Sequence, residues 1–283
     1  MGHQKHIISF SGGIGSAASA IIARDLGLDF EIVFADTTIE DEDLYRFNGD
    51  IAKALDKDLI TLRDGRDPWD VFVDVSYIGN SRTAHCSRIL KTKQVRDYIK
   101  SSGYENPILV LGMYRDEEDR LEVAKRNWNG VTVKSLLIEN SIYPGMARDM
   151  VEGLGVEIPR LYKMGFPHNN CGGFCVRAGQ GQAIHLLKTR PDFYNDMMLR
   201  NIWARSEIQR KTQDRIDAGT YRGKSESRSS GGFIRVKRGD DTKYFHLDEF
   251  KDRVKNGEFI PDPNDFGGCG CFVDDEQGSL FDD

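Results

Sequence analysis

Short apolar runs alternate with amphipathic stretches through the first two-thirds of the chain. The apolar runs predict strands at residues 6–10, 30–36, 58–62, 107–113 and 131–138. The stretches between them carry apolar residues at helical spacing, which predicts helices at 16–26, at 41–55 and after Cys86. Strands that are apolar on both faces and separated by helices indicate a parallel sheet with helices on both sides. The pattern therefore predicts an α/β fold with a doubly wound, mainly parallel, Rossmann-like sheet.

The pattern changes after the last predicted strand. The stretch 146–158 predicts a helix that ends at Gly153 or Gly155, and it leads into a loop-rich segment with two cysteines and then a helix-rich stretch. Glycine and serine dominate 219–232, which favours a linker, and 233–257 predicts a hairpin turning at Gly239-Asp240 and then a short helix. We therefore expect an α/β core at 1–145, a helical cysteine-containing segment at 146–217 and a small appended element at 218–283.

Composition is that of an ordinary soluble protein. Of the 283 residues, 39% are hydrophobic and 30% are charged. No stretch approaches the roughly 18 apolar residues of a membrane span, and no signal pattern precedes the first predicted strand. We expect a cytoplasmic protein without a membrane partner.

Charge is unevenly distributed, although the net charge of −6 gives no overall attraction to nucleic acid. Residues 209–238 carry nine Lys or Arg against three acids, whereas 262–283 carry seven acids and no base. A basic run is usually solvated surface, but Tyr221 and Phe233 stand among these charges and also favour binding to tRNA or DNA. Both interpretations of the run stay open.

The segment Ser11-Gly12-Gly13-Ile14-Gly15-Ser16 joins the first predicted strand to the first predicted helix. Glycines let backbone N–H groups approach a ligand, and the first turn of a helix offers unpaired donors and the positive end of its dipole. The two serines add hydroxyl donors. The pattern predicts an anion-binding loop, and the alternative is a tight turn in which Ser16 caps the helix.

Five segments, in order along the chain, carry a family resemblance. They are SFSGGIGS (9–16), VFADTTIEDEDLYRF (33–47), AHCSRILKTKQVRDYI (84–99), LGMYRDEEDRL (111–121) and GVEIPRLYKMGFPHNNCGGFC (155–175). The first resembles the SGGxDS pyrophosphate loop of the PP-loop superfamily of adenine nucleotide α-hydrolases. The others resemble the FADTGxExPET, Cys-x-x-x-Lys, GxRxxES and paired-cysteine segments of phosphoadenosine phosphosulfate reductases. The chain is closest in character to the reductase-like proteins of phages and nucleic-acid thiolation systems.

The resemblance implies that the chain binds ATP with Mg²⁺. The implied nucleotide-binding residues are Ser11, Gly12, Gly13, Gly15, Ser16, Phe34, Asp36 and Thr37. Asp36 would lie near the adenosine or its metal and is also a predicted catalytic residue; the alternative is that it caps the helix beginning near Asp41. Lys91 and Arg115 are predicted catalytic cations, because such side chains clamp phosphates.

One departure from the family concerns the metal. The loop aspartate of the family is Gly15 here, which removes a carboxylate that would help to hold Mg²⁺. A replacement ligand is expected from the acidic run Asp116, Glu117, Glu118 and Asp119. The acids at 40–43 suit a helix start and are expected to be structural, with Glu40 as the exception.

Cys86, Cys171 and Cys175 form a second group of candidate residues. Soft thiolates from a helix start and a glycine-rich loop suit an iron–sulfur cluster or zinc. Resemblance to cluster-bearing relatives implies a 4Fe–4S cluster on these three cysteines, with Zn²⁺ and free thiols as alternatives and His168 as a less favoured fourth ligand. Cys269 and Cys271 form a C-x-C pair in the acidic tail, where they relay sulfur or electrons, bind metal, or have no role.

The resemblance implies an enzyme, and two activities are in question. The first is an ATP pyrophosphatase and sulfurtransferase that acts at the α-phosphate, releases pyrophosphate and passes sulfur from a donor protein, such as a cysteine desulfurase, to a nucleic-acid or small-molecule acceptor. The alternative is a sulfonucleotide reductase that releases sulfite; the acids around Cys269 and Cys271 would disfavour the thiolate it needs. A non-catalytic nucleotide sensor is a second alternative. The acceptor and the oligomeric state are not indicated by the sequence.

Overall fold

A five-stranded parallel sheet lies at the centre of the computed structural model, which describes residues 4–222, 232–238 and 241–267. The strands are β1 (His6–Ser9), β2 (Phe30–Asp36), β3 (Leu59–Arg63), β4 (Ile108–Val110) and β5 (Thr132–Lys134). They lie in the order β3-β2-β1-β4-β5, and every neighbouring pair is parallel. The predicted α/β class with a parallel sheet is confirmed.

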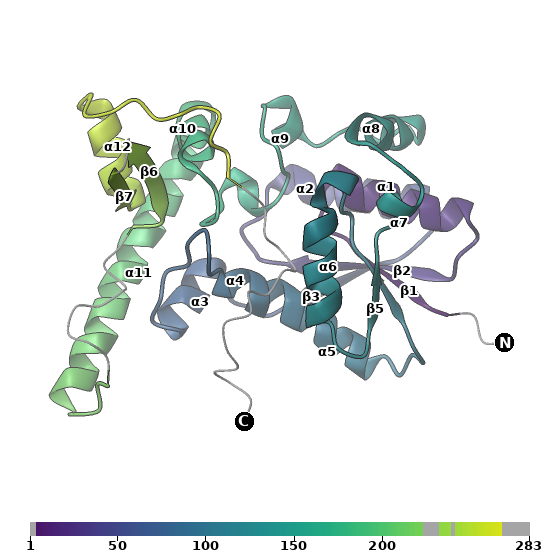
Figure 1. Cartoon of the computed structure of the whole chain (residues 1–283), viewed down its shortest axis with the longest axis horizontal. Coiled ribbons are helices and arrows are strands. Elements are labelled where there is room, and N and C mark those ends of the chain that lie inside the picture. Colours follow the sequence, from purple (N-terminus) through teal and green to yellow (C-terminus); the bar gives the residue numbers. More distant parts are fainter. Residues whose placement is uncertain (1–3, 223–231, 239–240, 268–283) are drawn as a thin grey trace.

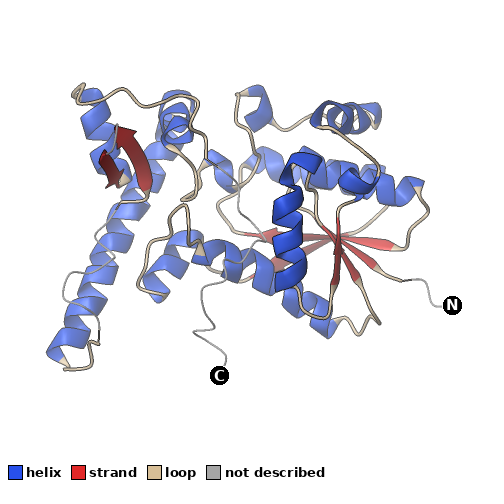
Figure 2. Cartoon of the chain, in the orientation of Figure 1, coloured by secondary structure: helices blue, strands red, loops and turns tan. Residues whose placement is uncertain are grey.

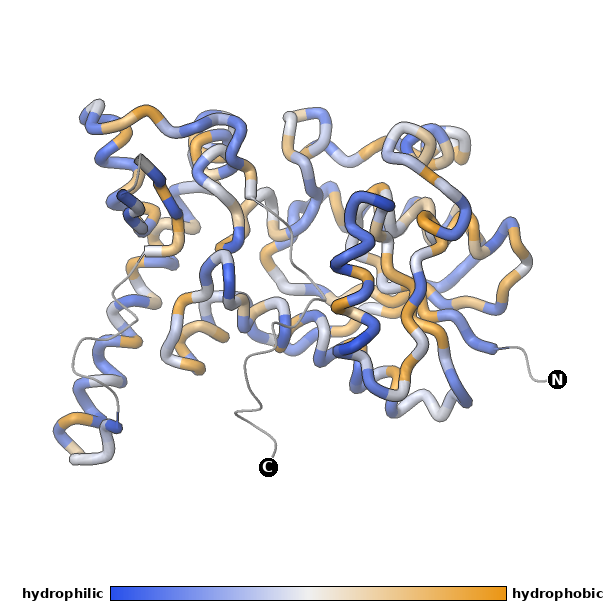
Figure 3. Tube along the Cα trace, in the orientation of Figure 1, coloured by the Kyte–Doolittle hydropathy of each residue, from blue (hydrophilic) through white to orange (hydrophobic). Residues whose placement is uncertain are grey.

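Helices cover both faces of this sheet (Figures 1 and 2). One face packs against α1 (Ile14–Asp25), α2 (Glu42–Ala54), α7 (Leu136–Glu139) and α8 (Pro144–Gly153), and the other against α5 (Lys93–Ser101) and α6 (Glu118–Asn127). Successive residues of β1 divide between the two faces: Ile8 packs in the α1 cluster, and Ile7 packs in the α5 cluster with Val95. Burial on both faces explains why the strands are mainly hydrophobic along their length (Figure 3). Helix α6 buries only one side and is mainly hydrophilic.

A third hydrophobic cluster joins the C-terminal elements to the sheet domain. Its elements are α3 (Pro68–Asp74), α10 (Gln180–Thr189), α11 (Pro191–Asp217), β6 (Ile234–Arg238), β7 (Asp241–Phe245) and α12 (Leu247–Lys255). Trp69 of α3 stacks on Phe174 and also contacts Phe233 at the start of the hairpin. The cluster crosses the predicted borders at 145 and 217, and the division into 1–145, 146–217 and 218–283 stays a prediction.

The hairpin and its short helix are as expected. Strands β6 and β7 pair antiparallel, and α12 follows them. The predicted turn at Gly239-Asp240 and the cysteines Cys269 and Cys271 lie outside the described residues. None of the described helices combines the length and the apolar composition that crossing a bilayer requires.

The predicted strand at 131–138 is wrong in its second half, because β5 ends at Lys134. Ser135 accepts a hydrogen bond from the Ile138 N–H and donates one to the Met113 carbonyl at 2.6 Å. A serine at this position caps a helix, and the apolar residues that follow it form α7. An apolar run alone does not distinguish a buried strand from a buried helix.

Candidate functional site

A cavity of about 590 Å³ opens where the strand order reverses. Strand β1 pairs with β2 on one side and with β4 on the other. The chain continues from β1 into α1 on one face of the sheet and from β4 into α6 on the other face. Ligands of open α/β sheets bind at such a switch point, outside the carboxyl ends of the strands. The cavity wall indeed comes from the residues that follow β1 and from Leu111, Gly112, Met113 and Tyr114, which follow β4.

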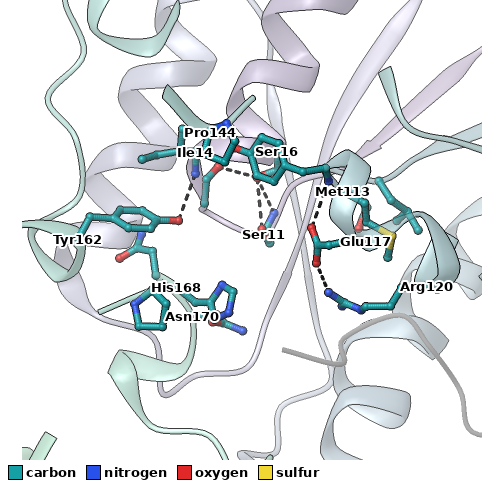
Figure 4. A pocket seen from close by; sticks show the side chains of 18 of the residues that line it. Ser11, Ile14, Ser16, Met113, Glu117, Arg120, Pro144, Tyr162, His168 and Asn170 are labelled. Atoms are coloured by element: carbon teal, nitrogen blue, oxygen red, sulfur yellow. Dashed lines mark hydrogen bonds and ion pairs between the residues drawn. The ribbon is translucent and has the colours of Figure 1, made fainter. Parts of the chain in front are cut away.

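The loop between β1 and α1 forms one wall of the cavity. Helix α1 begins at Ile14, and its N-cap residue Gly13 has no side-chain cap, so Ser16 lies in the first turn and is not the cap. The Ser16 hydroxyl donates to the Gly13 carbonyl at 2.9 Å and accepts from the Ser11 N–H at 3.2 Å (Figure 4). The loop therefore presents the first N–H groups of a 12-residue helix to the cavity, which is an arrangement that suits an anion.

Two glycines bring the first loop against the end of β4. A Cβ atom on Gly15 would lie 2.9 Å from the Gly112 carbonyl oxygen, and one on Gly112 would lie 2.6 Å from the Ser16 nitrogen. Both distances are shorter than carbon atoms tolerate without movement of the backbone. Close backbone approach therefore requires glycine at both positions, and it also explains why a carboxylate side chain has no room at Gly15.

Among the described residues, three Lys or Arg side chains line the cavity, and each comes from a different segment. Lys91 belongs to a π-helical turn (Arg88–Thr92), Arg120 to α6 and Arg148 to α8. π-Helical turns are rare and frequently mark functional sites; here the turn places Lys91 in the interior at 6% exposure. Glu117 accepts from the Tyr114 N–H at 3.1 Å and pairs with Arg120 on the same wall (Figure 4).

A segment around α9 (Arg160–Lys163) covers the first loop at two points. The Tyr162 hydroxyl accepts a hydrogen bond from the Ile14 N–H at 3.3 Å, and the Asn169 side-chain amide donates to the Gly12 carbonyl at 2.7 Å. His168 and Asn170 complete this side of the cavity (Figure 4). The segment thus contacts both the carbonyl and the N–H groups of the loop.

Lys91 also connects the cavity to the cysteine loop. Its ammonium group lies 3.8 Å from a Glu40 carboxylate oxygen and 3.9 Å from the Cys171 sulfur. Glu40 is buried, accepts from the Thr37 hydroxyl at 2.7 Å and accepts from the Cys171 N–H. Burial raises the pKa of Glu40 above its ordinary value, against the opposing influence of Lys91. One carboxylate therefore joins the end of β2 to the cysteine loop.

Asp41, the residue after Glu40, is connected to the cysteine loop through an arginine. Its fully buried carboxylate caps α2 and pairs with Arg160 at 2.7 Å and with Arg190 at 2.9 Å. Arg190 in turn donates to the Gly172 carbonyl at 2.6 Å. Cys171 and Gly172 both have positive φ, at 52° and 61°, and these contacts hold the tight turn in place.

Comparison with known proteins assigns the sheet domain to a family. Residues 5–140 match the family model of the phosphoadenosine phosphosulfate reductase domain, a stretch that contains the first loop, all five strands and the π-helical turn. These residues belong to the PP-loop, phosphoadenosine phosphosulfate reductase-like family. The predicted family resemblance is confirmed, and four of the five sequence segments lie within the matched residues; the fifth, 155–175, lies outside them.

Individual relatives are distant. An uncharacterized protein of Methanocaldococcus jannaschii is 24% identical in an alignment 236 residues long. The alignment covers 73% of this chain and 53% of that protein, so the chain spans about half of that protein's length. A phosphoadenylyl-sulfate reductase from Candida auris, solved as a phosphate complex, covers 59% of this chain and 79% of its own, at 12% identity and a TM-score of 0.43. A predicted subunit of tRNA methyltransferase from Methanocaldococcus jannaschii covers 53% and 75%, at 18% identity and a TM-score of 0.34.

The PP-loop domain brings most of the predicted phosphate-loop residues to the cavity. The predicted residues that line it are Ser11, Gly13, Gly15, Ser16 and Lys91. Gly12 lies behind them, held through its carbonyl by Asn169. In the acidic run, Asp116 and Glu117 line the cavity, whereas Glu118 and Asp119 do not. The roles of all these residues in binding stay predictions.

Other predicted site residues lie away from the cavity lining. Arg115 is exposed at the start of a 3₁₀ turn (Arg115–Glu117), and Arg120 one helical turn later lines the cavity instead. Asp36 is buried at 1% exposure, where it accepts from Arg63 and Tyr45 at 2.8 Å each. It caps no helix, because α2 begins at Glu42 with Asp41 as its N-cap.

Phe34 and Thr37 belong to this buried neighbourhood as well. Phe34 packs edge-on against Tyr45, and Thr37 donates to Glu40. The proposed contact of Asp36, Phe34 and Thr37 with a nucleotide stays a prediction, because these residues are not part of the cavity lining.

The cysteines do not form a recognisable metal centre among the described residues. The three described cysteines are partly buried and are not joined by a disulfide: they are Cys86, Cys171 and Cys175. The Cys171 sulfur lies 3.9 Å from the Lys91 ammonium group. Cys175 accepts from the Arg177 N–H at 3.4 Å. Within the described ranges no group of three or more Cys, His, Asp or Glu side chains is arranged to hold a metal ion. The 4Fe–4S cluster and the alternative Zn²⁺ on Cys86, Cys171 and Cys175 therefore stay predictions.

The basic run is only partly described, and one of its aromatic residues is buried. Phe233 is 3% exposed in the third hydrophobic cluster and is not available for stacking on a base. Arg210 on α11 pairs with Glu207 and Asp214, and Lys211 donates to the Val73 carbonyl. Binding of tRNA or DNA through 209–238 stays a prediction.

Sequence reasoning missed several residues of the cavity. They are Tyr114, Arg120, Arg148, Tyr162 and Asn169. Tyr162 and Asn169 belong to the segment 155–175, which resembles the family. Membership of this segment was the sequence signal that could have marked them as site residues. Arg148 comes from α8, and no local pattern marks it, since its place depends on how α8 packs across α1.

Proposed function

We propose that this chain binds an adenine nucleotide through its phosphates and acts at the α-phosphate. The observation that supports this proposal is the meeting of the α1 N-terminus with Lys91, Arg120 and Arg148 in one cavity at the switch point. Backbone N–H groups that are already oriented toward an anion, together with cations, stabilise charge that develops on phosphate oxygens. The family match supports a nucleotide of the adenine class.

In the proposed reaction an acceptor oxygen attacks the α-phosphorus. The new P–O bond forms as the bond between the α-phosphorus and the bridging oxygen breaks, and pyrophosphate leaves. The loop N–H groups and the three cations stabilise the negative charge that develops on the leaving pyrophosphate. Sulfide then attacks the adenylated carbon, so that a C–S bond forms as the C–O bond breaks and AMP leaves.

The predicted Mg²⁺ would supply charge neutralisation on the phosphates. Of the described residues in the cavity lining, Asp116 and Glu117 carry carboxylates, and Glu117 is already engaged by Arg120. The sulfur acceptor is proposed to be a nucleic acid or a small molecule, with a sulfur donor protein such as a cysteine desulfurase as partner.

A second candidate function is the reduction of a sulfonucleotide, and the family match favours it. The same cavity would then hold phosphoadenosine phosphosulfate. A thiolate would attack its sulfur, so that an S–S bond forms as the S–O bond to the nucleotide breaks and phosphoadenosine phosphate leaves. A second thiol would attack the sulfonated thiol, so that a disulfide forms and sulfite leaves. The two functions differ in product, and anaerobic incubation with each nucleotide separates them: pyrophosphate from ATP supports the first, and sulfite supports the second.

The binding site itself is tested by a double variant of the loop. We expect Ser11→Ala/Ser16→Ala to weaken ATP binding at least about tenfold, because hydrogen bonds to charged groups contribute roughly 1.5–3 kcal/mol each. Ser19→Ala is the matched control, since Ser19 lies in the same helix, donates to the Gly15 carbonyl and is not in the cavity lining. Unchanged affinity of the double variant in calorimetry would refute the phosphate-loop assignment.

A further inference from the structure

The first N–H group of α1 is already hydrogen-bonded, and its partner is a side chain that lines the cavity. The Tyr162 hydroxyl accepts from the Ile14 N–H at 3.3 Å, and Figure 4 shows this hydroxyl directed at the start of the helix from the opposite wall. A Cβ atom placed on Gly13 would lie 3.0 Å from the same hydroxyl oxygen. The hydroxyl therefore lies directly against the loop, in the position that an anion oxygen takes at a helix N-terminus.

The element that carries Tyr162 is fastened at its beginning. The Arg160 N–H donates to Asp43 at 2.7 Å, and the Arg160 guanidinium pairs with Asp41, also at 2.7 Å. Farther along the segment, Asn169 holds the Gly12 carbonyl. Because the segment is held on the start of α2 at Arg160 and on the loop at Asn169, we expect the Ile14 N–H to be freed by rotation of the Tyr162 side chain, without movement of the segment.

We propose that Tyr162 is a placeholder in the phosphate site, and that a phosphate oxygen of the ligand displaces its hydroxyl from the Ile14 N–H. A charged phosphate oxygen is a stronger acceptor for this N–H than a neutral phenol oxygen. The ligand class that displaces Tyr162 is therefore an ionised phosphate or pyrophosphate group, and a nucleoside without phosphate leaves it in place. This inference rests on the proposed function, since it assumes phosphate binding at the loop.

Displacement of Tyr162 predicts the direction in which a substitution changes the affinity for phosphate ligands. In the Tyr162→Phe variant the ligand no longer has to break the Tyr162–Ile14 hydrogen bond, so phosphate ligands should bind more tightly than to the unmodified protein. A net hydrogen bond of this kind corresponds to roughly threefold to tenfold in affinity. A tyrosine that serves only as a phosphate donor would have the opposite effect, because its removal would weaken binding.

Calorimetry with pyrophosphate, ATP and adenosine on three proteins tests the proposal. The proteins are the unmodified chain, Tyr162→Phe and Tyr143→Phe, the last being a control that removes an exposed tyrosine hydroxyl outside the cavity lining. We expect Tyr162→Phe to raise the affinity for pyrophosphate and ATP, to leave that for adenosine unchanged, and to melt within a few degrees of the unmodified chain. We expect Tyr143→Phe to change none of these affinities.

Two outcomes overturn the inference, and they are distinguishable. If the unmodified chain binds ATP or pyrophosphate and Tyr162→Phe binds them equally or less tightly, Tyr162 is not a placeholder, and the proposed function stands. If the unmodified chain binds neither compound, the proposed function fails and the inference fails with it. An equal gain for adenosine would also overturn the inference, because it would show a general opening of the cavity.

Discussion

The ammonium group of Lys91 lies 3.9 Å from the sulfur of Cys171, although these residues are 80 positions apart in the chain. Lys91 lines the phosphate cavity, and Cys171 belongs to the loop that Glu40 and Asp41 fasten to the sheet domain. A single cation therefore touches both groups of residues that the sequence marks as chemically important. In the proposed reaction this is the place where nucleotide and sulfur chemistry meet.

Removing this cation should weaken nucleotide binding. We expect Lys91→Met to reduce ATP affinity at least about tenfold, because a charge-assisted contact to phosphate contributes roughly 1.5–3 kcal/mol. Lys93→Met is the control, since Lys93 is exposed and pairs with Asp97 one turn along the same helix. Calorimetry with ATP measures both, and equal losses in the two variants would argue against a specific role for Lys91.

Glycine at position 15 should be needed for packing. We expect Gly15→Ala to destabilise the fold by about 1–3 kcal/mol, the usual cost of inserting a methyl group where there is no room, because its Cβ would meet the Gly112 carbonyl at 2.9 Å. Gly49→Ala is a matched control in α2, where a Cβ meets nothing within 4 Å; there alanine should stabilise by about 0.5–1 kcal/mol. Urea unfolding measures both changes, and the same sign for the two would contradict the close-approach argument.

Loss of the buried carboxylate of Glu40 should be costly. Glu40→Ala removes the carboxylate that pairs with the 6%-exposed Lys91 and that accepts from the Cys171 N–H. Breaking a buried pair from one side costs about 3–5 kcal/mol. Glu40→Gln keeps an acceptor oxygen and should cost less. Urea unfolding at neutral pH would contradict this account if Glu40→Ala were as stable as the unmodified chain.

Asp43 should contribute to the acid sensitivity of the fold. Its hydrogen bond with Arg46 lowers the pKa of its carboxyl below the ordinary value. A lowered folded-state pKa stabilises the fold above the unfolded pKa of about 3.9, and this contribution disappears as the pH falls through the folded pKa. We therefore expect Asp43→Asn to lose about 0.5–1 kcal/mol at pH 7, a value reduced by partial exposure, and to match the unmodified chain near pH 2.

Urea unfolding between pH 7 and pH 2 measures this difference. Asp58→Asn, at an exposed position before β3, controls for the change in net charge. A constant difference between Asp43→Asn and the unmodified chain across the range would contradict the linkage.

The fold could be predicted from the sequence because most of its strands and helices are specified by the pattern of apolar and polar residues within each segment. Apolar runs between amphipathic stretches specify buried parallel strands, and Gly13 and Gly15 mark the loop that follows the first of them. The predicted strand at 131–138 failed at Ser135, where one hydroxyl bonded to the distant Met113 carbonyl decides between strand and helix. That partner lies 22 residues away, and no local pattern reveals it.

The site was less predictable because its side chains converge from separate segments. Lys91 was predicted from its place behind Cys86, and it does line the cavity. Arg115 was predicted and Arg120 was not, yet Arg115 is exposed in the turn that follows β4, whereas Arg120 lines the cavity. Tyr162 reaches the loop across 148 residues of sequence. Such contacts depend on how the helices pack, which periodicity does not encode.

The position of β1 has a consequence for synthesis of the protein. β1 leaves the ribosome well before its second neighbour β4, which starts at Ile108, and the cover of the cavity follows only with Tyr162 and Asn169. A ligand stabilises only chains that already contain its site. If the proposed function holds, a nascent or truncated chain that ends before Asn169 gains little stability from cellular nucleotide, whereas a chain that extends past Asn169 is stabilised by it.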